Sequence, residues 1–142
     1  MGPFVLDASV TLSWCFADEA SQYSRDILSA LRTTYAVVPA LWPFEIANSL
    51  AIAARQGRIP GDGIAEFLES LRELPIQVER RESLWICQEV VRLSHSHGLS
   101  AYDAAYLELA KREGLALATL DRELSEASEK IGVPLLRPEK DR

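Results

Sequence analysis

The chain has 142 residues, of which 48% are hydrophobic and 25% are charged, a balance that excludes a disordered chain and suits one domain over residues 1–142. No apolar run approaches the roughly 18 residues that a membrane-spanning helix needs, and no basic segment leads into an apolar one near the start, so we expect a cytoplasmic protein without a membrane partner. The net charge of −6 disfavours a surface that grips nucleic acid by charge alone, although bound metal ions or a local basic patch could reverse the field at one site.

Short apolar runs alternate with helical patterns along the chain. Apolar and β-branched runs bounded by turn signals predict strands at residues 4–6, 35–38, 76–78 and 115–118, with 135–136 as a candidate last edge strand. Amphipathic periodicity and capping residues predict helices at residues 9–16, 18–32, 43–56, 62–73, 84–96, 100–113 and 121–131. Strands joined through helices form a mainly parallel sheet covered on both faces, so the predicted fold is a three-layer α/β/α architecture.

Four acidic residues fall where these strands end and helices begin. Asp7 directly follows the first predicted strand, and Asp121 comes shortly after the fourth. Glu45 and Asp103 each lie in the first turn of a predicted helix. Helices that follow parallel strands begin at the edge where those strands end. We therefore expect all four carboxylates at the carboxyl edge of the sheet, where open α/β sheets bind their ligands.

Each of these acids also has a purely structural explanation. Carboxylates stabilise helix N-termini, Ser100 and Asp103 have the spacing of a capping box, and Asp121 fits an N-cap. The four together are harder to explain in this way, because Glu45 and Asp103 lie in apolar helical sequence and no Lys or Arg adjoins Asp7, Glu45 or Asp103. Converging carboxylates repel one another unless a cation joins them, and an all-oxygen set suits Mg²⁺ or Mn²⁺. Such ions activate water and hold phosphate oxygens, which predicts phosphodiester hydrolysis.

The chain resembles the PIN-domain nucleases, and among them the toxin subunit of VapBC-type toxin–antitoxin pairs. The resemblance runs from residue 4 to about residue 136, and its motifs are residues 5–9, 43–48, 100–107 and 118–121. It implies a PIN-like α/β/α fold and a metal-dependent endoribonuclease that cleaves RNA. It also implies inhibition by a small antitoxin protein and, frequently, a homodimer.

Carried over residue by residue, the resemblance implies roles for the acids and for two hydroxyl residues. Asp7, Asp103 and Asp121 match the metal ligands, here for Mg²⁺ or Mn²⁺. Glu45 matches the catalytic acid that orients metal-bound water or completes the coordination of a second ion. Ser9 and Thr119 match positions where a hydroxyl supports the acids.

Asn48 lies one turn after Glu45 on the same predicted helix. It is a candidate for a supporting hydrogen bond to the acids. A polar residue on the flank of a helix is an equally good explanation.

Other functions fit the acids less well. A haloacid-dehalogenase-like phosphatase needs a second Asp two residues after Asp7, where this chain has Ser9, and a phospho-receiver domain needs a Lys in a late loop that is not evident here. A housekeeping RNA-processing nuclease and a non-catalytic PIN scaffold that binds protein or RNA remain alternatives. The compact length without an added RNA-binding module favours the toxin, and the complete set of acids favours catalysis.

The remaining candidate residues have simpler explanations. We expect His95 and His97 to stabilise the C-terminus of a helix rather than to bind metal, and Cys15 and Cys87 to be reduced core thiols. The tryptophans are expected in the core or in an interface, with RNA stacking as the alternative: Trp14, Trp42 and Trp85.

Two surface features each have both a structural and a functional explanation. Arg80 with Arg81, and Arg55 with Arg58, are expected to be solvated, with contact to RNA phosphates as the alternative. The helical segments around residues 41–54 and 68–71 are candidates for an αα-hairpin whose groove accepts an antitoxin helix, with ordinary core packing as the alternative.

Overall fold

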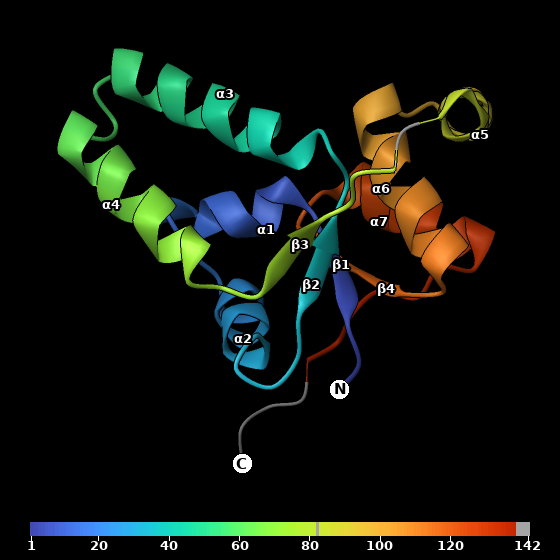
Figure 1. Cartoon of the computed structure of the whole chain (residues 1–142), viewed down its shortest axis with the longest axis horizontal. Coiled ribbons are helices and arrows are strands. Elements are labelled where there is room, and N and C mark those ends of the chain that lie inside the picture. Colours follow the sequence, from blue (N-terminus) through green and yellow to red (C-terminus); the bar gives the residue numbers. More distant parts are fainter. Residues whose placement is uncertain (82, 139–142) are drawn as a thin grey trace.

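The computed structural model describes residues 1–81 and 83–138, and its centre is a parallel sheet (Figure 1). The strands are β1 (Phe4–Leu6), β2 (Ala36–Val38), β3 (Ile76–Val78) and β4 (Ala116–Ala118), in the order β3-β2-β1-β4. Phe4 of β1 lies opposite Ala36 on one side and Ala116 on the other. The residues of β1 are fully buried because both neighbouring strands and helices on both faces cover them.

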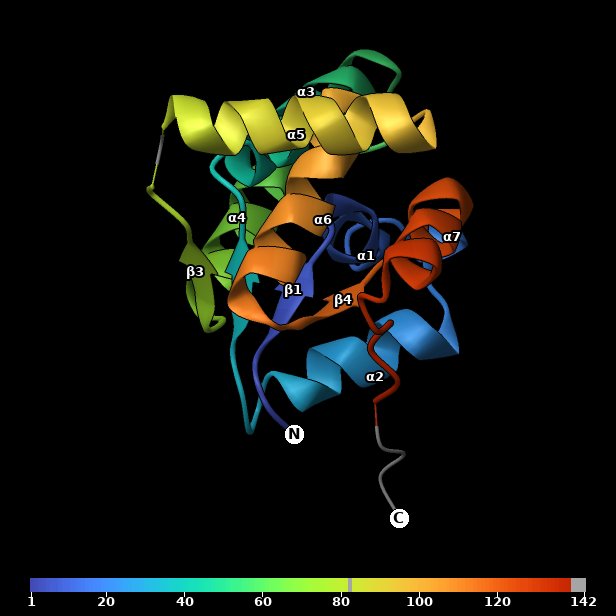
Figure 2. The same ribbon diagram turned by 90° about the vertical axis from the view of Figure 1, so that its right-hand side faces the viewer.

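Helices cover the two faces of the sheet (Figures 1 and 2). On one side lie α1 (Ala8–Ser13), α2 (Gln22–Ala30), α3 (Trp42–Arg55) and α4 (Gly61–Arg72), and on the other lie α5 (Leu84–His97), α6 (Ala101–Glu113) and α7 (Arg122–Ile131). On the second side, α6 packs against β1, and α5 and α7 pack against α6. The predicted α/β/α architecture with a parallel sheet is confirmed.

Local signals explain where the helices nearest the carboxyl edge of the sheet begin and end. Pro43 lies in the first turn of α3, where its missing N–H removes no hydrogen bond. Gly98 ends α5 with a φ of +65°, a left-handed conformation that suits glycine, and the chain then turns into α6. Ser100 caps α6 by accepting a hydrogen bond from the N–H of Asp103. These turns bring the start of α3 and the start of α6 to the upper end of the sheet in Figure 1.

Three of the predicted elements are wrong in extent. The first is the helix predicted at residues 9–16, which spans Ala8–Ser13. The helix predicted from residue 18 begins only at Gln22, because Ser21 and Ser24 form a capping box there, and residues 17–19 form a separate 3₁₀ turn. The candidate last strand is reduced to one bridge, between Leu135 and Leu117.

Two side chains lie on the surface: Cys87, which the sequence places in the core, and Trp85, which it places in the core or in an interface. Trp85 is 71% exposed, and Cys87, a free cysteine, is exposed as well. Both belong to α5, which packs against α6 and in which Leu93 is the buried residue, while Leu84, Trp85 and Val91 are exposed. Trp42, by contrast, is buried as expected.

In the part of the chain that the structure describes, no helix combines the length and the apolar character that crossing a membrane requires.

Candidate active site

Asp7 lies at the point where β1 ends and α1 begins, and it is only 5% exposed. Its backbone N–H donates to the carbonyl of Ala118 at 2.9 Å, which ties it to β4. Its Oδ2 accepts hydrogen bonds from the hydroxyls of Ser9, at 2.6 Å, and Thr119, at 2.7 Å. Burial raises the pKa of Asp7, the two hydroxyls lower it, and the charge of Asp121 raises it further.

The same two hydroxyls hold the loop that follows β4. The oxygen of Ser9 accepts the backbone N–H of Leu120 at 3.0 Å, and the oxygen of Thr119 accepts that of Asp121 at 3.0 Å. Each hydroxyl therefore donates to Asp7 and accepts from the loop. This network fixes the backbone of Asp121 beside Asp7.

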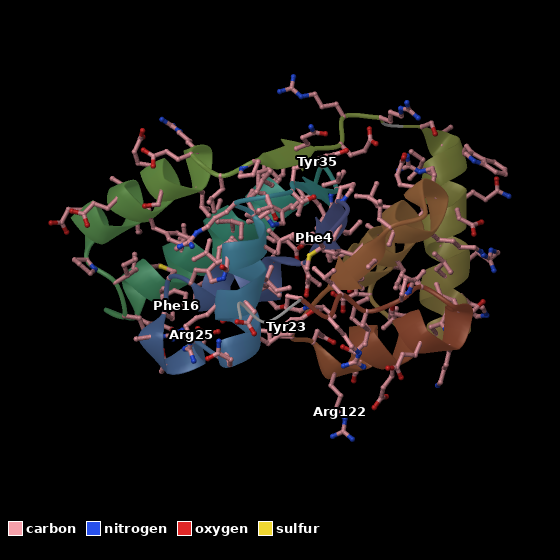
Figure 3. The ribbon with its side chains drawn as sticks, turned by 90° about the horizontal axis from the view of Figure 1, so that it is seen from below. Phe4, Phe16, Tyr23, Arg25, Tyr35 and Arg122 are labelled. Atoms are coloured by element: carbon pink, nitrogen blue, oxygen red, sulfur yellow. The ribbon has the colours of Figure 1, made fainter. Side chains whose placement is uncertain are left out.

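The Asp121 side chain serves partly as a helix cap. Its Oδ1 accepts the N–H of Leu124 at 2.8 Å at the start of α7. The neighbouring Arg122 does not neutralise it, because its side chain is 91% exposed and pairs with Glu126. Figure 3 shows Arg122 pointing away from the rest of the molecule.

Glu45 is tied to α6 by a buried tyrosine. The hydroxyl of Tyr106 donates to Oε1 of Glu45 at 2.6 Å, and Tyr106 is fully buried. Burial raises the pKa of Glu45, the Tyr106 hydrogen bond lowers it, and the charges of Asp7 and Asp103 raise it. Burial and the nearby negative charges also raise the pKa of Tyr106, so the hydroxyl stays a donor.

Tyr106 is absent from the residues that the sequence analysis singles out. The signal that could have found it is its place three residues after Asp103, on the same side of the helix.

Asp103 has the clearest sign of uncompensated charge. Its backbone N–H donates to Ser100, as the capping spacing predicts, while its carboxylate is only half-buried at the start of α6. Burial, followed by the charges of Asp121 and Asp7, raises the pKa of Asp103 to about 6. The structure therefore brings the four acids close enough for their charges to act on one another.

The structure does not gather these acids into a ready coordination shell. Within residues 1–81 and 83–138, no three His, Cys, Asp or Glu side chains lie close enough together to hold a metal ion. Asn48 is exposed on α3, and no hydrogen bond joins it to any of the four acids in the described part of the chain. His95 and His97 lie in the last turn of α5, where cationic side chains favour the helix dipole.

Comparison with known proteins decides the family. The model of the PIN domain matches residues 4–130. The chain belongs to the PIN-domain family. Among PIN domains it is 31% identical to Ribonuclease VapC3 of Pyrobaculum aerophilum, over 86% of this chain and 92% of that protein. It is 28% identical to Ribonuclease VapC3 of Mycobacterium tuberculosis, over 87% of this chain and 85% of that one. The expected resemblance to VapC-type PIN domains is confirmed.

Solved structures agree on the fold. A crystal structure of a protein from Pyrobaculum aerophilum matches this PIN domain with a TM-score of 0.67 at 26% identity, over 88% of this chain and 84% of that one. A toxin–antitoxin complex from Klebsiella pneumoniae contains a chain that matches with a TM-score of 0.65 at 14% identity, over 97% and 99% of the two chains. At that identity, the second likeness concerns the fold alone.

Proposed function

We propose that this chain is a Mg²⁺- or Mn²⁺-dependent endoribonuclease, the toxin of a type II toxin–antitoxin pair, which works in the cytoplasm as a single nuclease domain over residues 1–142. The observation that carries the proposal is the group of four carboxylates at the ends of β1 and β4 and the starts of α3 and α6. The PIN-domain match and the relatives named as ribonucleases support RNA as the substrate.

The chemistry of the site suits a hard divalent cation. Asp7 and Asp103 have raised pKa values because the acids are partly buried and repel one another, which is the charge imbalance that a cation removes. Mg²⁺ commonly binds through one or two carboxylates and keeps several waters, so it does not require three side chains already in contact. In this proposal Asp7, Asp103 and Asp121 hold the ion. The bound ion would supply an activated water and a contact for the phosphate.

The other residues of the site orient these groups. Glu45, held by Tyr106 at 2.6 Å, accepts a proton from the attacking water or orients that water. Ser9 and Thr119 keep one oxygen of Asp7 fixed through hydrogen bonds of 2.6 and 2.7 Å. Asn48 remains a candidate supporting residue, one turn along α3 from Glu45.

An antitoxin protein and a second copy of this chain are the proposed protein partners. The relatives named VapC3 support the first, because the VapBC-type resemblance implies an antitoxin partner. A groove of about 280 Å³ between α3, α4 and β3 is an apolar surface of the kind that an amphipathic antitoxin segment fits. It is lined by Trp42, Pro43, Ile46, Leu68, Leu71, Arg72, Leu74 and Ile76.

The test is cleavage of mixed cellular RNA by purified protein free of antitoxin, with Mg²⁺, with Mn²⁺ and with chelator. We expect discrete fragments that vanish with chelator and with Asp103→Asn. Fragments that persist under both conditions would show that the nuclease does not use this site. A folded protein that cleaves nothing with either metal would favour a scaffold that binds without cutting.

A further inference from the structure

One buried hydroxyl joins the two helical layers at the carboxyl edge of the sheet. Glu45 lies on α3 and Tyr106 lies on α6, and these helices belong to opposite layers (Figure 1). The hydroxyl of Tyr106 donates to Oε1 of Glu45 at 2.6 Å. The Tyr106 side chain is fully buried, and α6 packs against β1, so the core of the molecule holds the donor in place. Glu45 is therefore tied to a group whose own position is fixed.

The Tyr106 hydroxyl also faces the turn that carries Asp7. The backbone N–H of Ala8 opposes the rise in pKa of both Tyr106 and Asp7, so this N–H lies near the oxygens of both side chains. The charge of Asp7 raises the pKa of Tyr106, which agrees with the same placement. Tyr106 thus fixes Glu45 relative to Asp7, the residue proposed above as a metal ligand.

Glu45 is a costly partner for a buried tyrosine. A buried hydroxyl needs an acceptor, but a backbone carbonyl is enough, as Tyr23 shows by donating to the carbonyl of Leu136 at 2.9 Å. A carboxylate in that role must be desolvated, and burial is the largest cause that raises the pKa of Glu45. The charges of Asp7 and Asp103 raise this pKa as well. The hydrogen bond therefore keeps a charge where stability alone disfavours one, which indicates a role in the reaction.

The hydrogen bond occupies one oxygen of Glu45 and leaves the other to water. Within residues 1–81 and 83–138, Tyr106 is the only side chain that bonds to the Glu45 carboxylate, and it bonds to Oε1. A hydrogen bond to the charged form also favours that form, so Tyr106 lowers the pKa of Glu45. A group that takes a proton from water must be both ionised and correctly aimed. Tyr106 contributes to both conditions.

We propose that Tyr106 is a positioning residue, which fixes Oε1 of Glu45 so that Oε2 faces the attacking water. This inference rests on the ribonuclease function proposed above. Tyr106 touches neither the substrate nor the reacting atoms. It acts through Glu45, and the two residues form one unit.

The test is steady-state cleavage of an RNA oligonucleotide that carries a site cut in the cellular RNA assay. Tyr106→Phe removes only the hydroxyl, and the ring still fills its place in the core. We expect kcat to fall about 10-fold or more while KM stays within about 2-fold of the parent. The acidic limb of the pH profile of kcat should move to higher pH, because Glu45 loses the hydrogen bond that lowers its pKa. Asp7 and Asp103 act on Glu45 in both proteins, so the difference between the two profiles reports the hydrogen bond.

A double substitution shows whether Tyr106 acts through Glu45. Glu45→Gln alone should lower kcat about 100-fold or more. Adding Tyr106→Phe should lower it little further, as for residues that act as a unit. Ser128→Ala is the control, since it removes a fully buried hydroxyl of α7 that donates to the carbonyl of Val133 at 2.8 Å. It should lower the melting temperature and leave kcat and its pH profile unchanged.

Carboxyl ¹³C NMR in chelator gives a readout without turnover. The pKa of Glu45 should be higher in Tyr106→Phe than in the parent, and equal values would overturn the inference. If the parent cleaves RNA and folded Tyr106→Phe keeps its kcat and pH profile, Tyr106 is only structural and the nuclease stands without it. Effects of Glu45→Gln and Tyr106→Phe that multiply in the double variant would also overturn the inference, because the two residues would then act independently. If the parent cleaves nothing, the nuclease function fails, and the positioning role fails with it even where the NMR difference is seen.

Discussion

Asp7 is the most constrained residue of the site, because its carboxylate is buried and accepts two hydroxyl hydrogen bonds at one oxygen. Asp7→Asn keeps the size of the side chain but removes the charge that would hold a cation. We predict that it lowers metal-dependent RNA cleavage by about 100-fold or more, while circular dichroism and the melting temperature show a retained fold. Full activity in a folded Asp7→Asn protein would exclude Asp7 as a metal ligand.

Thr119 links Asp7 to the backbone of Asp121, donating to the first at 2.7 Å and accepting from the second at 3.0 Å. Thr119→Val keeps the shape and removes both hydrogen bonds. We predict that the Mg²⁺ concentration for half-maximal cleavage rises about 10-fold or more, since residues that orient metal ligands commonly have effects of this size. Thr33→Val is the control, because the Thr33 hydroxyl is exposed and donates to the carbonyl of Ala30 at the end of α2, away from the four acids. An unchanged Mg²⁺ dependence in Thr119→Val would exclude this positioning role.

At the scale of elements, a buried ion pair within α6 also reaches Glu79, the residue after β3. Glu108 is 5% exposed, and Nε of Arg112 donates to both of its carboxylate oxygens, at 2.9 and 3.2 Å. Nη1 of Arg112 also lies 3.5 Å from Oε2 of Glu79. Arg112→Ala would leave the Glu108 carboxylate buried without its partner. We predict a loss of about 3 kcal/mol in the free energy of unfolding, measured by urea denaturation.

Arg92→Ala is the matched control for Arg112→Ala. Arg92 forms an ion pair with Glu89 one turn earlier on α5, but that pair is exposed. Exposed pairs of this kind contribute little to stability, so the free energy of unfolding should hardly change. Equal losses in the two variants would contradict the idea that burial makes the Arg112 pair important.

The elements that the sequence predicts well are those whose boundaries are set by neighbouring residues. The strand at 76–78 is predicted to the residue, because it follows Pro75 and alternates in polarity, and Gly98 ends α5 as its backbone freedom suggests. The start of α2 is missed because acidic residues at 18 and 19 resemble a first helical turn, whereas Ser21 provides a stronger cap.

What the sequence does not reveal depends on contacts between distant segments. Glu45 and Tyr106 are 61 positions apart in the sequence, so no local sequence pattern predicts their hydrogen bond. The surface position of Trp85 depends on α5 packing against α6 with one face only, which periodicity does not determine. The position of the four acids at the carboxyl edge of the sheet could be predicted. In a parallel sheet the strands end, and the helices that follow them begin, at the same edge.

At the scale of the whole molecule, the meeting of four acids at one edge sets how stability depends on pH. The pKa of Asp103 is about 6 in the folded protein, against an ordinary value of 3.8. Between these values the folded chain binds more protons than the unfolded chain, so this group lowers stability as pH rises from about 4 to 6. Above pH 6 its full destabilising effect is present, and a bound divalent cation would relieve it.

Asp103→Asn removes this effect and should therefore stabilise the protein only where Asp103 is ionised. We predict a melting temperature about 2–4 °C above the parent at pH 7.5 in chelator, equivalent to about 1 kcal/mol once solvent screening at a half-buried site is allowed for, and no difference near pH 4. Added Mg²⁺ should stabilise the parent more than the variant at pH 7.5, because only the parent keeps the full set of carboxylates. Glu66→Gln, an exposed carboxyl of α4, controls for a general change of net charge and should show neither effect. A variant that gains as much at pH 4 as at pH 7.5 would mean that Asp103 acts through packing rather than charge, and the electrostatic argument for a cation at this edge would lose its basis.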